Sequence, residues 1–236
     1  MGRQWLHSKK EVTANRKAKI TSKLVREITI AAKMGVPDPE MNARLSLAVE
    51  AARKQSVPND VIARAIKKAS GQGDDAVNYE LVTYEGMGPL NVPVIVECMT
   101  ENRNRTAPDI RSLFKDAQFG SKVMFLFDHL GIVEATTGKA GIDLETVAIE
   151  VGAQDVQPLE NTPEEQSGGR FLCDRTDLDT VTAALKTAGW DVASAELGYI
   201  AKDPVELPAD GRAKVEAFLE RVDDHDDVHR VYAALK

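Results

Sequence analysis

The chain has 236 residues, of which 43% are hydrophobic, so it is long enough for two or three folded domains and is not a disordered chain. It contains no apolar run of about 18 residues, and residues 1–20 lack the apolar stretch of a secretory signal, so no membrane partner is expected. The net charge of −7 hides an asymmetry: residues 1–70 carry fifteen Lys and Arg against six Asp and Glu, a net charge of +9, whereas the remainder carries −16.

Three helices are predicted in residues 1–70, each with apolar residues at helical spacing. Gly35 ends the first, and Asp38 and Pro39 are the expected N-cap and first residue of the second. The third extends from about Pro58 to Ser70. The apolar positions are Ile20, Leu24, Ile28 and Ala31 in the first helix, Leu45, Ala48, Val49 and Ala52 in the second, and Val61, Ile62, Ala65, Ile66 and Ala69 in the third.

After a Gly-rich, acidic linker at Gly71–Asp75, the pattern changes to alternating strands and helices. Pro93 cannot donate to a strand ladder, so we expect the strand that it begins to lie at a sheet edge. The predicted order is strand 79–86, turn 87–91, strand 92–100, helix 107–118 and strand 122–131, followed by strand 131–136, helix 142–152, residues 154–160, strand 168–174, helix 177–189 and residues 190–197.

The tail contains a helix from Asp210, an acidic turn at Asp223–Asp227 and a strand-like segment at 228–235. A lone helix and strand cannot bury their apolar faces, so they must complete an earlier sheet. We therefore expect an α+β fold with a small helical domain and two sandwich-like α+β domains, the third inserted in the second. The expected domains are 1–75, 76–131 together with 203–236, and 132–202.

The stretch TENRNRTAPDI, residues 100–110, places two arginines near a predicted helix start. Thr106 and Asp109 resemble a capping box with Pro108 in the first turn, so Arg103 and Arg105 are expected just ahead of the helix. A helix N-terminus beside two guanidinium groups would favour a phosphate. Pairing of the arginines with carboxylates of the same chain is the alternative.

Several segments together resemble the YebC family over essentially the whole chain. They are KLVREITIAAK, VPNDVIARAIKKASG, YEGMGP, IVECMTENRNRT and DDHDDVHRVY, and the opening MGRQW is similar to the branch that begins Met-Gly-Arg. The resemblance implies a helical N-terminal domain followed by two α+β domains. In this chain the segment after Gln118 is shorter than the Gly- and Asn-rich loop common in the family, and Leu90-Asn91 stands where glycines are usual.

The resemblance implies a nucleic-acid-linked regulator of gene expression. Bacterial members are usually described as probable DNA-binding transcriptional regulators, whereas mitochondrial relatives activate translation and other bacterial members relieve ribosome stalling. We expect a DNA-binding transcriptional regulator, with a ribosome-associated translation factor and a protein-interaction scaffold as alternatives. Self-association is left open.

The expected nucleic-acid contacts are basic side chains of the helical domain and of the arginine loop, which would neutralise phosphates without reading sequence. Trp5 and His7 could stack on an unpaired base or pin the terminus to the core. No recognition helix, RNA-binding aromatic motif or zinc-finger spacing is present. The candidate residues are Lys9, Lys10, Arg16, Lys17, Lys19, Lys23, Arg26, Arg64, Lys67, Lys68, Arg103 and Arg105.

The remaining chemistry-bearing residues do not predict an enzyme. The four histidines are scattered, and neither a serine elbow nor a phosphate-binding Gly loop with Lys is found. Asp223–Asp227 lacks Ca²⁺-loop spacing, so a solvated turn or a partner for Arg103 and Arg105 is expected instead of a metal site. Cys98 and Cys173 lie in strand-like runs without metal-ligand spacing, which fits a reduced, cytoplasmic protein without a cofactor.

Overall fold

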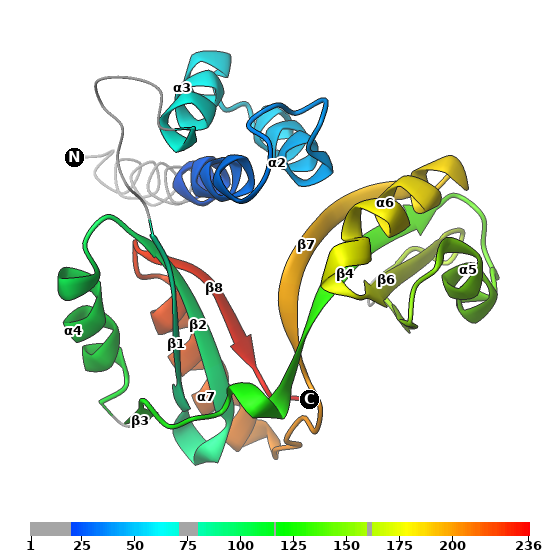
Figure 1. Ribbon diagram of the computed structural model, residues 1–236. Coiled ribbons are helices and arrows are strands. Elements are labelled where there is room, and N and C mark those ends of the chain that lie inside the picture. The colour runs from blue at the N-terminus through cyan, green and yellow to red at the C-terminus, as the bar shows by residue number, and fades with distance from the viewer. Residues whose placement is uncertain (1–19, 71–79, 116, 160–161) are drawn as a thin grey trace, which may run out of the picture. The chain divides into compact units, whose positions relative to one another are not determined.

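A computed structural model describes residues 20–70, 80–115, 117–159 and 162–236 (Figure 1). The chain divides into two compact units, Met1–Asn78 and Tyr79–Lys236. The linker predicted at Gly71–Asp75 lies outside the described residues. No helix among the described residues combines the length and apolar character that a membrane crossing requires.

The first unit is helical, as the apolar spacing predicts. Residues 20–34 form a first helix, followed by α2 (Ala43–Lys54) and α3 (Asn59–Ala69). Ile20 is 41% exposed, so the buried stripe of the first helix is shorter than expected. The buried core consists of Ile28, Ala31, Ala32, Leu45, Ala48, Val49, Ala52, Val57, Ile62 and Ala65.

The second helix begins later than predicted because Asn42, not Asp38, is its N-cap. The Asn42 side chain accepts a hydrogen bond from the Leu45 amide at 3.0 Å and donates to the Ala31 carbonyl at 2.9 Å. It therefore caps one helix and fastens the end of the preceding one. Asp38 instead accepts from the Glu40 amide at 3.0 Å, which makes a local turn that competes with helix formation.

The second unit contains two four-stranded sheets (Figure 1). The first has the order β3-β1-β2-β8, with antiparallel pairing throughout. Because β8 pairs with β2 after the second sheet is complete, the predicted assignment of the tail is confirmed. The strands are β1 (Glu80–Met87), β2 (Pro93–Thr100), β3 (Gln118–Phe119) and β8 (Val228–Ala233).

Two helices, α4 (Arg103–Leu113) and α7 (Ala209–Asp223), cover one face of this sheet. Alternate residues of β2 face them, as the period of two in a strand requires. The Phe114 ring contacts Phe218 of α7 edge-on, with ring centroids 5.1 Å apart. The buried core contains Val94, Val96, Cys98, Ile110, Phe114, Phe218, Val222 and Val228.

The second sheet has the antiparallel order β5-β6-β4-β7 and carries α5 (Leu144–Val151) and α6 (Leu178–Thr187). It is inserted between α4 and α7 in the chain. The expected boundary at Ile132 falls within β4, which begins at Phe127. The domain boundaries stay a prediction. The strands are β4 (Phe127–Thr137), β5 (Asp155–Pro158), β6 (Ser167–Cys173) and β7 (Asp191–Ala201).

The two sheets meet where β7 passes β8. The Tyr199 ring of β7 contacts the Tyr232 ring of β8 at 5.2 Å and stacks on His129 of β4 at 4.4 Å. The Tyr232 hydroxyl donates to Glu97, which is only 8% exposed, at 3.2 Å. Burial and then the Glu97 carboxylate raise the pKa of Tyr232, so its hydroxyl stays protonated and can donate. Arg230 of β8 also pairs with Glu196 of β7.

Two predictions about the strands are wrong. The segment 122–131 is not one strand: Met124–Leu126 form a 3-10 turn, and β4 then continues without a break through Gly131. The turn forms because the Glu85 carboxylate accepts hydrogen bonds from two consecutive amides there. Pro93 does not mark an edge strand, since β2 lies between β1 and β8; as the first residue of β2, it costs the ladder little.

Substitution of Gly86 in β1 tests how tightly β3 packs against β1. A Cβ at this position would lie 2.6 Å from the Gln118 backbone oxygen and 2.9 Å from the Phe114 ring. We expect Gly86→Ala to lower the free energy of unfolding by about 1–3 kcal/mol, because a backbone atom cannot move aside cheaply. Denaturant unfolding measures this. Gly138→Ala is the control, since its Cβ would meet nothing within 4 Å, and equal stability of the two variants would contradict the packing.

Candidate nucleic-acid interface

Most of the predicted N-terminal contacts cannot be placed. Lys9, Lys10, Arg16, Lys17 and Lys19 lie outside the described residues, as do Trp5 and His7. Lys23 and Arg26 lie on the first helix and are half-buried. These two side chains are the described part of the basic stripe expected there.

The cations of α3 lie on its outer side, as its apolar spacing predicts. Arg64 and Lys67 are exposed, and Lys68 is half-buried. Arg64 pairs with Asp60 one turn earlier, an exposed contact that contributes little stability. Within the described part of the chain Lys67 has no ion-pair partner, so its ammonium group is available to a phosphate.

Not every cation of this unit faces solvent. The Arg44 guanidinium bonds Glu27 at 3.0 Å, with the two side chains 13% and 18% exposed, so this pair holds α2 against the first helix. Exposed Arg53 and Lys54 in the last turn of α2 were not among the sequence candidates. Both lie at a helix C-terminus, where the helix dipole already accounts for cations. Their position therefore did not single them out as nucleic-acid contacts.

The helix after β2 lies earlier in the chain than predicted: α4 is Arg103–Leu113 where residues 107–118 were expected, and Gln118 belongs to β3. The N-cap of α4 is Asn102, whose side chain accepts from the Asn104 and Arg105 amides, so Arg103 and Arg105 lie in the first turn and not ahead of it. Pro108 is consequently inside the helix, where it cannot donate to the Asn104 carbonyl. Both arginines are exposed, so they remain beside the amides of a helix N-terminus.

Thr106 is fully buried and connects the start of α4 to two other elements. Its hydroxyl lies 2.7 Å from the Thr100 hydroxyl at the end of β2 and 2.6 Å from an Asp227 carboxylate oxygen. The Asn102 amide donates to Thr100 Oγ1 at 2.9 Å. Because a hydroxyl has one hydrogen, all groups are satisfied if Thr100 donates to Thr106 and Thr106 donates to Asp227. The carboxylate therefore ends a polar chain.

Asp227 belongs to the Asp223–Asp227 cluster, which was expected to be either a solvated turn or a partner for the arginines. Arg105 Nη2 lies 3.2 Å from both Asp227 oxygens, and the Asp227 carbonyl accepts from the Met99 amide at 2.9 Å. Asp227 is 14% exposed whereas Arg105 is 58% exposed. The predicted pairing is thus confirmed for Arg105, while Arg103 makes no ion pair with any described residue.

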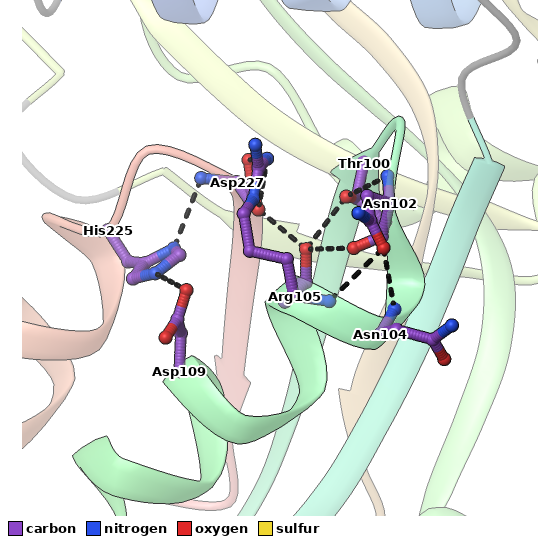
Figure 2. Close-up of polar contacts among 8 residues, drawn as sticks. Thr100, Asn102, Asn104, Arg105, Asp109, His225 and Asp227 are labelled. Carbon is purple, nitrogen blue, oxygen red and sulfur yellow. Dashed lines mark hydrogen bonds and ion pairs between the residues drawn. The ribbon is translucent and has the colours of Figure 1, made fainter.

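His225 orders the turn between α7 and β8. Its Nδ1 accepts from the Asp227 amide at 3.1 Å, so a neutral ring carries its hydrogen on Nε2. Nε2 lies 4.0 Å from an Asp109 carboxylate oxygen (Figure 2). The ring therefore links the turn to α4 through Asp109.

The pocket beside this network is acidic. It has a volume of about 430 Å³ and is lined by Arg105, Asp109, Asp224, His225, Asp226 and Asp227. Four carboxylates around one guanidinium repel a phosphate, so an anion would have to approach Arg105 from the solvent side of α4. Among the described residues, no three His, Cys, Asp or Glu side chains converge to hold a metal ion.

Comparison with protein-family models gives two matches that together cover nearly the whole chain. Residues 2–72 match the TACO1/YebC protein N-terminal domain, and residues 79–235 match the TACO1/YebC second and third domain. Two similar bacterial proteins are each named a probable transcriptional regulatory protein. One, from Pseudomonas syringae pv. syringae, is 47% identical over 100% of this chain and 99% of its own. The other, from Bdellovibrio bacteriovorus, is 46% identical over 100% of both.

A solved structure has the same fold. It is the crystal structure of a conserved hypothetical protein from Aquifex aeolicus, with a TM-score of 0.80 and 33% sequence identity over 94% of this chain and 90% of that one. That protein is described without an activity, so this likeness supports the α+β architecture and adds nothing about a ligand.

Thr106 tests whether the polar chain stabilises the fold. We expect Thr106→Val to lower the free energy of unfolding by about 1–3 kcal/mol, because it leaves the largely buried Asp227 carboxylate without its hydroxyl donor. Chemical denaturation followed by circular dichroism provides the measurement. Thr187→Val, which removes an exposed hydroxyl bonded only within its own helix, should change stability little. Similar losses in both variants would contradict a special role for Thr106.

Proposed function

The chain belongs to the TACO1/YebC family, and we propose that it is a nucleic-acid-binding regulator of gene expression, acting in the cytoplasm without catalysing a reaction. The names of its bacterial relatives support a regulatory role. The finer description that we favour is a DNA-binding transcriptional regulator.

The observation that carries this proposal is the separation of charge along the chain. Residues 1–70, most of them in a helical unit of their own, have a net charge of +9, although the whole chain has −7. Neutralising phosphates releases condensed counterions, so such a unit binds a polyanion with an affinity that falls steeply as salt rises. The acidic remainder limits contacts elsewhere on the molecule.

One observation favours the ribosome as the second candidate partner. The cations of α3 are the exposed Arg64 and Lys67 and the half-buried Lys68, which suit phosphates, and residues 63–69 around them contain no Asn or Gln to read base edges. Folded ribosomal RNA offers a dense array of phosphates and is recognised largely by shape. The same surface would serve a translation factor.

The Arg105–Asp227 contact adds a second proposed contact surface, in the other unit. In the free protein Arg105 is held by a carboxylate of its own chain. A phosphate oxygen could replace that carboxylate, because both are anionic acceptors of a guanidinium group. We propose that Arg103 and Arg105 contact phosphate and that Asp227 competes with it for Arg105.

Neutralising two basic side chains of the helical unit tests the main proposal. We expect Lys23→Gln/Lys67→Gln to weaken binding to duplex DNA and to ribosomal subunits. The slope of log affinity against log salt should become shallower by about 2, because each lysine accounts for about one phosphate contact. Fluorescence anisotropy across a salt series measures the DNA arm, and co-sedimentation measures the ribosome arm.

The matched control is Lys139→Gln/Lys186→Gln, which removes the same charge from two exposed lysines of the inserted sheet domain. Equal effects of the two pairs would show a response to net charge only and would contradict a defined surface. Retention on ribosomal subunits in excess random duplex DNA would replace the transcriptional description with the translational one. Loss to the DNA competitor would support the transcriptional description.

Asp227→Asn tests the proposed competition at Arg105. Removing the charge should raise the affinity for nucleic acid by about 2- to 5-fold, since it weakens a partly exposed ion pair worth less than about 1 kcal/mol. Asp226→Asn is the control, because Asp226 lines the same pocket and has the same charge but makes no bond to Arg105.

In the double variant Asp227→Asn/Arg105→Gln the gain should disappear, because it depends on Arg105. A gain that persists in the double variant, or that Asp226→Asn reproduces, would contradict the competition. Thermal melting of each variant verifies that it is folded at the assay temperature.

A further inference from the structure

Phe125 is the aromatic side chain that the fold leaves most open to solvent in the described part of the chain. It is 69% exposed, whereas Phe114, Phe127, Phe171 and Phe218 are each buried. A phenyl ring has no polar atom for water to solvate. Its exposure therefore loses the favourable free energy of burying apolar surface. A ring in this position needs an explanation other than folding.

The turn that carries Phe125 is firmly held. The Val123 and Met124 amides both donate to Glu85 Oε2 at 2.8 Å, and the Leu126 amide donates to the Val123 carbonyl at 2.9 Å. Val123 and Phe127, on either side, are buried in the cluster around Ile95. With both flanks anchored inward, the backbone that carries the ring is held at the surface before any ligand arrives, which lowers the entropic cost of binding.

A lysine precedes Phe125 by three positions in the chain. Lys122, immediately before the turn, is exposed, and the Glu85 carboxylate is already occupied by the two amides. Lys202, whose amide donates to the Leu126 carbonyl, pairs with Asp128 at 3.3 Å. The turn therefore offers a flat apolar face and one ammonium group that makes no ion pair with any described residue.

We propose that Phe125 stacks on an unpaired base of single-stranded nucleic acid, with Lys122 contacting an adjacent phosphate. This inference rests on the proposed nucleic-acid function and names the form of nucleic acid that this turn takes. Every base has a π-face, and a phenyl ring has no hydrogen-bonding group, so the contact tolerates any sequence. The bases of a duplex are already stacked on each other, so the site should discriminate strongly against duplex.

The test uses the full chain and fluorescein-labelled single strands of mixed sequence, as RNA and as DNA, alongside the matching duplex. Phe125→Ala should weaken single-strand binding by about 10-fold, within the range that loss of one aromatic–base stack produces, and should leave duplex binding unchanged. Phe125→Trp should retain single-strand affinity, and its additional tryptophan emission should be quenched on binding. Lys122→Gln should make the salt dependence shallower by about 1.

Ile149→Ala is the matched control, because Ile149 is an exposed apolar residue on α5 at 80% exposure and should have no effect. Unchanged single-strand affinity in Phe125→Ala, with binding still weakened in Lys23→Gln/Lys67→Gln, would overturn the stacking site and leave the proposed function intact. An equal loss on single strand and duplex would also overturn stacking. Failure of the unaltered protein to bind DNA, RNA or ribosomes would instead remove the proposed function itself.

Discussion

The fold of the second unit depends on the pairing of β8 with β2, which closes the first sheet after the chain has built the second. The Thr106–Asp227 hydrogen bond that accompanies this pairing spans 121 positions. Closing such a segment costs chain entropy, although the cost grows only with the logarithm of its length. Burial of Phe218, Val222 and Val228 beside β2 offsets it, because these side chains have no other core to enter.

This closure also sets the joint between the two sheets. The same strand that pairs with β2 presents Tyr232 and Arg230 to β7, where they meet Tyr199 and Glu196. Gly198 lets the strands approach closely there, since a Cβ would lie 3.3 Å from the Tyr232 ring and 2.7 Å from the end of the Ile132 side chain, which would have to shift. The inserted sheet is therefore packed through aromatic and ionic contacts onto the strand that completes the first sheet, and it is not attached by its two chain connections alone.

The parts of the fold that could be predicted from sequence are those governed by apolar periodicity. The helices of the first unit, α7 and β8 were all found this way, because burial of an apolar face decides them. Helix starts were missed where more than one polar residue could serve as the N-cap. Asp38 and Thr106 each matched a capping signature, but Asn42 and Asn102 are the caps, and each is also hydrogen-bonded to a residue ahead of its helix, Ala31 and Thr100 respectively.

The candidate site was predictable to a lesser extent. Charge composition indicated Asp223–Asp227 as a candidate partner for the arginines. It could not select Asp227 among the four aspartates, since that choice depends on the register between β8 and the end of β2. Phe125 was not among the predicted site residues, for a similar reason. Within an apolar run, periodicity predicts one buried strand, and only the Glu85 carboxylate, from a distant strand, converts the run into a turn that exposes the ring.

The positions of the two proposed contacts in the second unit constrain what could occupy both. Arg105 lies just after the end of β2 at Thr100, whereas the turn bearing Phe125 is fixed by Glu85, near the end of β1 that pairs with the start of β2. The eight residues of β2 separate these ends by roughly 25 Å. A mononucleotide could not reach from one to the other. A polynucleotide strand could, and the acidic pocket beside Arg105 would keep it on the solvent side of α4, where both arginines are exposed.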